Sequence, residues 1–232
     1  HGARDHGGRV RVLERSVPTA PLSAEKENDI VRVIPLGGVE EIGKNMTVVE
    51  FRGAIYIVDI GLQFTDEETP GVDYIVPDTK YLEARKKKIK GVFITHGHLD
   101  HIGGIPYIMD KLGNPPIYTR QLTGTMIKKR QEEFQHLPKL NLEIIERDTR
   151  MKIAPDFSVR FFNVTHTIPD AMGVIFETPF GNLIFTGDLK IDHKDGVPLK
   201  HEEDTFGALG KENNLALFAD STNVERPGFS LS

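Results

Sequence analysis

Short runs of apolar residues, separated by glycine-bearing turns, make up most of the pattern of this chain. The first three runs, at residues 31–34, 46–51 and 54–59, are rich in Val and Ile and have the length of strands. Only Arg52 and Gly53 separate the second run from the third, which predicts a tight β-hairpin. We therefore expect the first part of the fold to consist of strands of one sheet.

Three later segments have the pattern of helices. Residues 79–88 follow Asp78, and either this residue or Thr79 is suited to cap the beginning of a helix. Apolar residues are spaced for one helical face in residues 103–112, whereas residues 123–136 are strongly charged on their outer side. The remaining apolar runs predict strands, two of them joined by a turn at 178–181; these runs lie at residues 91–95, 116–118, 142–145, 157–164, 172–177, 182–186 and 215–220.

The balance of these elements predicts the fold class. Strands dominate, helices intervene, and the sequence contains no internal repeat or low-complexity block. An α/β sandwich with mixed β-sheets fits this order better than a doubly wound parallel fold. Residues 1–28 lack hydrophobic periodicity, so we expect a disordered tail before a domain that begins at residue 29.

Composition narrows the possible chemistry. The chain has no cysteine, so disulfides are impossible and any metal must be held by imidazole and carboxylate groups. Its formal net charge of -5 gives no global basic signature of a small nucleic-acid-binding domain, although a local groove can still be positive. No apolar run approaches the roughly 20 residues that span a bilayer, and no secretion signal is visible, so we expect a soluble, cytoplasmic protein without a membrane partner.

A dense cluster of potential metal ligands stands near the middle of the chain. It comprises four side chains within six consecutive residues: His96, His98, Asp100 and His101. The apolar run 91–95 ends directly before them, which predicts that a rigid strand delivers them on an irregular loop. Gly97 would relax the backbone there, so that alternate side chains converge on adjacent ions. Chance clustering of histidines is the structural alternative, and this density makes it the weaker interpretation.

Further ligands are expected at other strand ends, because a catalytic zinc takes three protein ligands and keeps one position for water. His166 and Asp188 each follow an apolar run, as His96 does. Either residue alone would more often be a turn residue or a hydrogen-bonded surface group, but the histidine cluster favours a ligand role. Asp59 also ends an apolar run, where it is either a turn former or a carboxylate that orients a metal-binding histidine.

Two basic runs, at residues 85–88 and 128–130, could contact phosphate groups without regard to sequence. Charge runs on helices are usually solvated surfaces, and this is the stronger interpretation of both.

Specific stretches of sequence surround the candidate ligands: residues 35–38, 41–45, 95–104, 165–170, 186–188 and 219–223. The His-x-His-x-Asp-His pattern, with a later His and a later Asp, resembles the metallo-β-lactamase superfamily. The surrounding stretches are similar to the ribonuclease J family within the β-CASP branch of that superfamily, and the similarity runs from about residue 31 to the last residue. The resemblance implies an αββα sandwich with mixed β-sheets, of which residues 29–220 would form the first, N-terminal part.

The resemblance also implies a centre with two zinc ions, which manganese could replace because nitrogen and oxygen ligands suit several divalent ions. It assigns one zinc to His96, His98 and His166, the other to Asp100 and His101, and the bridging position to Asp188. A bridging hydroxide would attack phosphorus in RNA. Asp59 and Asp220 match acidic motif residues of the family, and Asp220 would help to position a histidine that acts as general acid.

The activity implied is 5′-to-3′ exonuclease and endonuclease action on RNA that carries a 5′-monophosphate, in a full-length protein that forms homo-oligomers. The chain stops where the β-CASP insertion would begin, so we expect residues 221–232 to be the start of that insertion and the chain to be an incomplete fragment. Two alternatives stay open. One is a hydrolase of small molecules, such as a lactonase or β-lactamase, and the other is a non-catalytic metal-binding fragment.

Overall fold

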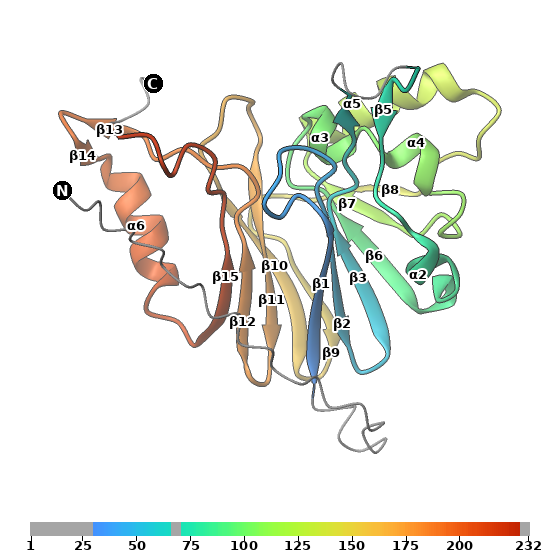
Figure 1. Ribbon diagram of the computed structural model, residues 1–232. Helices are drawn as coiled ribbons and strands as arrows, with labels where there is room; N and C mark the ends of the chain where they lie inside the picture. Colours follow the sequence, from blue (N-terminus) through green and yellow to red (C-terminus); the bar gives the residue numbers. More distant parts are fainter. Residues whose placement is uncertain (1–29, 66–70, 228–232) are drawn as a thin grey trace, which may run out of the picture.

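Two β-sheets face each other in the computed structural model, which describes residues 30–65 and 71–227 (Figure 1). Helices cover the outer face of each sheet, so the layers follow the order αββα. The predicted sandwich with mixed sheets is confirmed. The tail expected at residues 1–28 lies outside the described residues, and the boundary expected at residue 221 stays a prediction.

The first sheet has the strand order β1-β2-β3-β6-β7-β8. The pairs β1–β2 and β2–β3 are antiparallel, whereas β3, β6, β7 and β8 run parallel to one another. The predicted hairpin is confirmed, because Phe51 pairs with Ala54 and both turn residues have the positive φ of a type I′ turn. The strands are β1 (Val31–Gly37), β2 (Met46–Phe51), β3 (Ala54–Val58), β6 (Ile89–Phe93), β7 (Ile117–Thr119) and β8 (Leu142–Ile144).

The second sheet has the order β15-β12-β11-β10-β9, and only the pair β12 and β15 is parallel. Its strands are β9 (Arg150–Ala154), β10 (Phe157–Asn163), β11 (Met172–Thr178), β12 (Gly181–Phe185) and β15 (Asn214–Phe218). Two short antiparallel ribbons lie outside the sandwich: β4 (Gln63–Phe64) with β5 (Tyr74–Ile75), and β13 (His193–Lys194) with β14 (Val197–Pro198).

Alternation along the strands separates two sides of the first sheet. In β3, Tyr56 and Val58 pack into the core between the sheets, whereas Ile55 and Ile57 pack into the core beneath the helices. Phe176 of β11 is fully buried in the core between the sheets. Its ring centroid lies 5.6 to 6.1 Å from neighbouring rings in several strands, as the separations of 5.6 Å to Phe93 and 5.9 Å to Tyr56 illustrate. This aromatic core fixes the two sheets against each other.

The helices depart most from the sequence-based expectation. They are α2 (Lys80–Glu83), the 3-10 turn η1 (Lys86–Lys88), α3 (Leu99–Ile102), α4 (Ile105–Ile108), α5 (Gln121–Gln131), η2 (Glu132–Phe134) and α6 (Lys200–Leu209). A single helix over residues 79–88 is wrong, because three successive lysines offer no apolar face and repel one another. The predicted helix 103–112 is regular only over α4.

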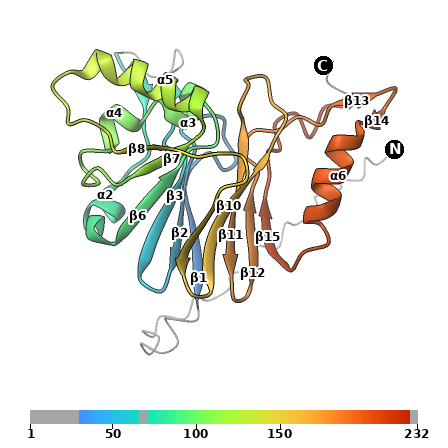
Figure 2. The same ribbon diagram turned by 180° about the vertical axis from the view of Figure 1, so that it is seen from behind.

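Helix α6 and strand β9 were not expected from the sequence. Figure 2 shows α6 against the outer face of the second sheet, where Phe206 and Leu209 contact the core around Ile175. Its first turns are almost entirely polar, so the apolar periodicity is too weak to predict a helix. In the part of the chain that the structure describes, no helix is long and apolar enough to cross a membrane.

The aromatic core between the sheets predicts the cost of losing one ring. We expect Phe176→Ala to lower the free energy of unfolding by about 3–5 kcal/mol, because the change leaves a cavity among rigid neighbours. Phe64→Ala is the matched control, since Phe64 is 66% exposed and should change stability by about 0.5 kcal/mol or less. Urea denaturation followed by circular dichroism measures both. Equal losses in the two variants would contradict this account of the core.

Candidate metal centre

The candidate ligands meet at one end of the sandwich, the upper end in Figure 1. β3 and β6 run parallel, and β10 and β12 share one direction because both are antiparallel to β11. The carboxyl ends of these strands therefore lie along one edge, and His96, His166 and Asp188 follow three of them. The core fixes the strands, and the short segments after them need only turn inwards.

The first group consists of His96, His98, His166 and Asp188. Nδ1 of His98 lies 3.1 Å from Nε2 of His96 and 3.1 Å from Nε2 of His166. An oxygen of Asp188 lies 3.9 Å from the ring of His96 and 3.7 Å from that of His166. A shared cation stabilises imidazole nitrogens that face one another this closely.

The second group consists of Asp100, His101 and, again, Asp188. Nε2 of His101 lies 3.4 Å from a carboxylate oxygen of Asp100 and 3.1 Å from the other oxygen of Asp188. In each group the potential ligand atoms lie within 4.8 Å of one another. Asp188 thus offers one oxygen to each group, which is the geometry of a carboxylate between two adjacent ions.

The quartet does not lie wholly on an irregular loop, and that expectation is wrong. His96 and His98 precede helix α3, but Asp100 and His101 belong to its first turns. Gly97 has no positive φ, so its role is spatial: a Cβ atom there would lie 2.5 Å from Sδ of Met126 in α5. Turning the chain directly into α3 points the two pairs of ligands toward different groups.

Asp59 connects β3 to both the histidine segment and α3. Its side chain is only 4% exposed, and its carboxylate accepts hydrogen bonds from Thr95 N–H at 2.8 Å and from the Thr95 hydroxyl at 2.9 Å. The same carboxylate lies 2.8 Å from Nδ1 of His101. A proton held on Nδ1 leaves Nε2 of His101 free to face Asp188. The structure therefore places Asp59 where a carboxylate would orient a metal-binding histidine.

Thr95 is the contact that the sequence analysis missed. Because its hydroxyl donates to Asp59, it can accept from Nδ1 of His96, which lies 3.0 Å away. This arrangement leaves Nε2 of His96 facing the first group. Thr95 thus contacts one candidate ligand, His96, directly, and through Asp59 it is linked to a second, His101.

Asn45 is a second residue that the analysis did not single out for a role. Its amide donates to the backbone oxygen of Asp100 at 3.2 Å and to the Asp100 carboxylate at 3.4 Å. Close approach of this segment requires Gly61, where a Cβ atom would lie 1.6 Å from the oxygen of Asp100. Asn45 lies within a stretch that carried the family resemblance, which was the only signal for it.

The protonation of the cluster follows from burial and from neighbouring charges. Burial, together with the neighbouring His101, lowers the pKa of His96 to about 2, so its imidazole is neutral. Burial alone would lower the pKa of His101, but Asp59 and the hydrogen bonds with Asp100 and Asp188 raise it well above its ordinary value. Although burial acts in the opposite direction, the hydrogen bond with His101 lowers the pKa of Asp188 to about 2. The centre therefore favours positive charge beside ionised carboxylates and a neutral imidazole.

Asp220 follows β15 beside the same edge, yet it contacts no ring in either group. Its carboxylate accepts from Thr222 N–H at 2.7 Å and from Leu189 N–H at 3.4 Å. It therefore connects its own turn to the residue after Asp188. The predicted role of Asp220 in positioning a general acid stays a prediction.

Arg120 supports the segment that carries His166. The side chain is 6% exposed, and its Nη1 donates to the backbone oxygen of Ala171 at 3.1 Å, whereas Nε and Nη2 have no hydrogen-bond partner. Close by, Asp170 accepts from Leu122 N–H in α5 at 3.1 Å. The end of the His166 segment is thereby fastened to the first turn of α5.

Comparisons with known proteins agree with this geometry. A family model described as the metallo-beta-lactamase superfamily matches residues 40–218, which include every candidate ligand. The solved structure "Rm3 metallo-beta-lactamase" aligns with a TM-score of 0.52 and 14% identity, over 81% of this chain and 74% of that one. At this identity the likeness shows the fold alone.

Two curated relatives carry the name of the resembling family, and the predicted similarity is confirmed. Ribonuclease J of Thermus thermophilus is 43% identical over 211 residues, which cover 88% of this chain and 36% of the relative. Ribonuclease J2 of Bacillus subtilis is 37% identical over 208 residues, which cover 90% and 37%. The chain thus spans little more than a third of the length of these relatives.

The contacts of Asp59 generate a prediction for metal affinity. Asp59→Asn keeps the shape of the side chain but removes the charge that holds Nδ1 of His101, so we expect binding at the second group to weaken about 10–100-fold. Binding at the first group should change less. Competition with a chromophoric chelator measures both affinities, and Asp110→Asn at an exposed position is the control. Unchanged affinity in Asp59→Asn would show that Asp59 only forms a turn.

Arg120 yields a second prediction. Arg120→Met keeps most of the buried volume but removes the hydrogen bond to Ala171, so the first group should bind metal about fivefold more weakly, as expected for about 1 kcal/mol. Cobalt(II) titration should show this shift together with a changed absorption spectrum. Arg120→Lys, which keeps a donor, should restore part of the affinity. A loss of thermal stability with an unaltered cobalt spectrum would argue against a positioning role.

Proposed function

Because the chain belongs to the metallo-β-lactamase superfamily, we propose that it carries the metal centre of a ribonuclease J-type enzyme that hydrolyses phosphodiester bonds in RNA. One observation carries this proposal: two adjacent groups of ligands share Asp188, within a sequence 43% identical to a named ribonuclease J. Two neighbouring divalent ions suit phosphodiester hydrolysis, since they neutralise charge on both attacking and leaving oxygens.

The proposed ions are two zinc ions, with manganese as a possible substitute. His96, His98 and His166 would hold one, Asp100 and His101 the other, and Asp188 would bridge them. When bound, the ions would supply a nucleophilic hydroxide at neutral pH and polarise the phosphodiester. The donor set fits, because imidazole nitrogen and carboxylate oxygen are both good zinc ligands.

The protein's own groups have distinct tasks in this proposal. Asp59 and Thr95 keep His101 and His96 oriented, so that the ligand nitrogens need not rearrange during the reaction. Asp100 is held in turn by Asn45. We assign Asp220 to the substrate side, where it would help to position a general acid.

The two groups are unequal in the described residues. The first has four potential ligands and the second has three, one of which is shared. We therefore propose that the first group binds metal more tightly. Exonuclease and endonuclease action, preference for a 5′-monophosphate, homo-oligomer formation and a cytoplasmic location are proposed for the whole protein, since the relatives are much longer than this chain.

The proposal is tested by removing two ligands. His96→Ala with His98→Ala should abolish tight zinc binding and any cleavage of 5′-monophosphorylated RNA, because two of the four potential ligands of the first group are lost. The matched control replaces His136 and His201, two exposed histidines, with alanine. Elemental analysis gives the metal content, and gel electrophoresis of labelled RNA gives the cleavage.

Each result has a clear consequence. Metal content unaffected by loss of His96 and His98 would overturn the assignment of the centre. Metal binding with turnover of a lactam or lactone, but not of RNA, would favour the small-molecule hydrolase instead. Metal binding without turnover of RNA, lactam or lactone would favour a non-catalytic metal-binding fragment.

A further inference from the structure

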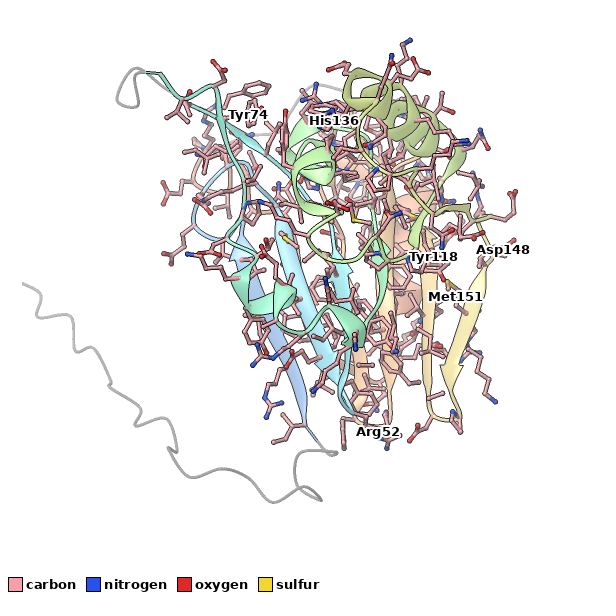
Figure 3. The ribbon with its side chains drawn as sticks, turned by 90° about the vertical axis from the view of Figure 1, so that its right-hand side faces the viewer. Arg52, Tyr74, Tyr118, His136, Asp148 and Met151 are labelled. Carbon is pink, nitrogen blue, oxygen red and sulfur yellow. The ribbon has the colours of Figure 1, made fainter. Side chains whose placement is uncertain are left out.

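A basic crevice lies at the end of the sandwich away from the metal centre. It has a volume of about 380 Å³ and lies where the β2–β3 hairpin turns beside η1. Figure 3 places Arg52 at this end and His136 at the opposite end. The five residues of β3 run from the crevice toward Asp59, roughly 17 Å at about 3.3 Å per residue. The crevice is therefore separate from the ligand cluster.

Four cationic side chains from three segments line this crevice: Arg32 of β1, Arg52 of the hairpin turn, and Arg85 and Lys88 of the segment after α2. Two carboxylates oppose them, since Arg32 lies 3.9 Å from Glu50 and Arg52 lies 2.6 Å from Asp156. Lys88 forms no ion pair with any described carboxylate. Among the described residues, four cationic side chains therefore stand against two carboxylates, although the chain as a whole has a net charge of -5.

Two of the guanidinium groups lie over aromatic rings. Arg85 lies 4.0 Å from the ring centroid of Tyr81, and its Nη1 also donates to the Tyr81 backbone oxygen at 3.0 Å. Arg52 lies 4.7 Å from the ring of Phe51. A guanidinium fixed in this way loses little further conformational entropy when its remaining N–H groups bind an oxyanion.

Glu50 is the acidic residue that lines the crevice, and its carboxylate offsets one of the four positive charges. It accepts a hydrogen bond from the Tyr81 hydroxyl at 2.7 Å, and its side chain is only 13% exposed. The side chains of Arg32 and Arg52 are 41% and 38% exposed, and Lys88 is also exposed, so these cationic groups are accessible to an anion.

The other basic run provides an internal contrast. Lys129 pairs with Glu132 at 2.7 Å, and Arg130 pairs with Glu133 at 3.0 Å, on the exposed side of α5 and η2. Two of the three cationic side chains of this run are thus paired within one helical surface. The run at residues 85–88 instead contributes Arg85 and Lys88 to the basic crevice.

We propose that this crevice binds phosphate groups, from a free nucleotide or from an RNA strand. Planar guanidinium forks match the paired oxygens of a phosphate, and Lys88 adds a point charge. A volume of about 380 Å³ exceeds the need of a single inorganic ion and lies in the range of small-ligand sites. The site does not depend on the metal centre, so its existence is independent of the proposed hydrolysis.

Two matched double variants test the site with the intact chain in EDTA, where the metal centre cannot act. Arg85→Gln with Lys88→Gln removes two charges that line the crevice, and Lys86→Gln with Lys87→Gln removes two neighbouring charges that do not. The probes are pyrophosphate and adenosine 5′-monophosphate in calorimetry, and a short labelled oligouridine in fluorescence anisotropy. Lys88→Gln alone is the further variant, since Arg85 packs against Tyr81 and its loss could affect folding.

We expect Arg85→Gln with Lys88→Gln to weaken binding of the probes at least about tenfold. The salt dependence of the binding constant should fall by the equivalent of about two phosphate contacts. Lys86→Gln with Lys87→Gln should change both quantities far less. Loss for both pyrophosphate and the nucleotide identifies a free nucleotide as the ligand, whereas loss for oligouridine alone identifies an RNA strand. Equal weakening in the two double variants would overturn the proposal, because general charge would then explain it. No binding of any probe to the unchanged protein would also overturn it.

Discussion

The buried carboxylate of Asp59 is the contact on which the arrangement of the centre depends. It receives the backbone and the hydroxyl of Thr95 and faces the ring of His101, so one side chain joins β3, the end of β6 and α3. A buried charge is costly unless every lone pair finds a partner, and here these contacts supply them. The backbone of Asp59 has a φ of 61°, which aspartate tolerates better than most residues. The turn with this backbone conformation also brings the Asp59 carboxylate to Thr95 and His101.

The sandwich explains why segments far apart in the sequence can meet at this carboxylate. Alternating side chains give each strand one face toward the second sheet, and aromatic rings such as Phe93 and Phe176 fill that interface. Strand direction then decides which ends share an edge. His96, His166 and Asp188 need only short turns to converge, because the core has already brought the strand ends together.

The sequence predicted which side chains meet at the candidate centre better than it predicted the residues that hold them in place. His96, His98 and His101 are chemically conspicuous, and apolar runs before His166 and Asp188 indicated strand ends. Thr95, Asn45 and Arg120 have no such signal, since a threonine, an asparagine or an arginine acquires its role only from tertiary contacts. The sequence did not predict helix α6 for a related reason, because the helix packs through a few residues near its end rather than through a repeating apolar face.

The sequence pattern alone could not distinguish the two basic runs. Both read as solvated helical surfaces, and for residues 128–130 the acidic residues one turn later support that interpretation. Residues 85–88 contain no acidic residue within the run, and helix α2 ends before Lys86. This break allows Arg85 and Lys88 to line the same crevice as Arg52, which comes from the β2–β3 hairpin. Mutual repulsion among lysines, which disfavours a regular helix, is reduced when an anion lies between the charges. The feature that made the predicted helix wrong is therefore the same feature that gives the crevice its affinity for phosphate.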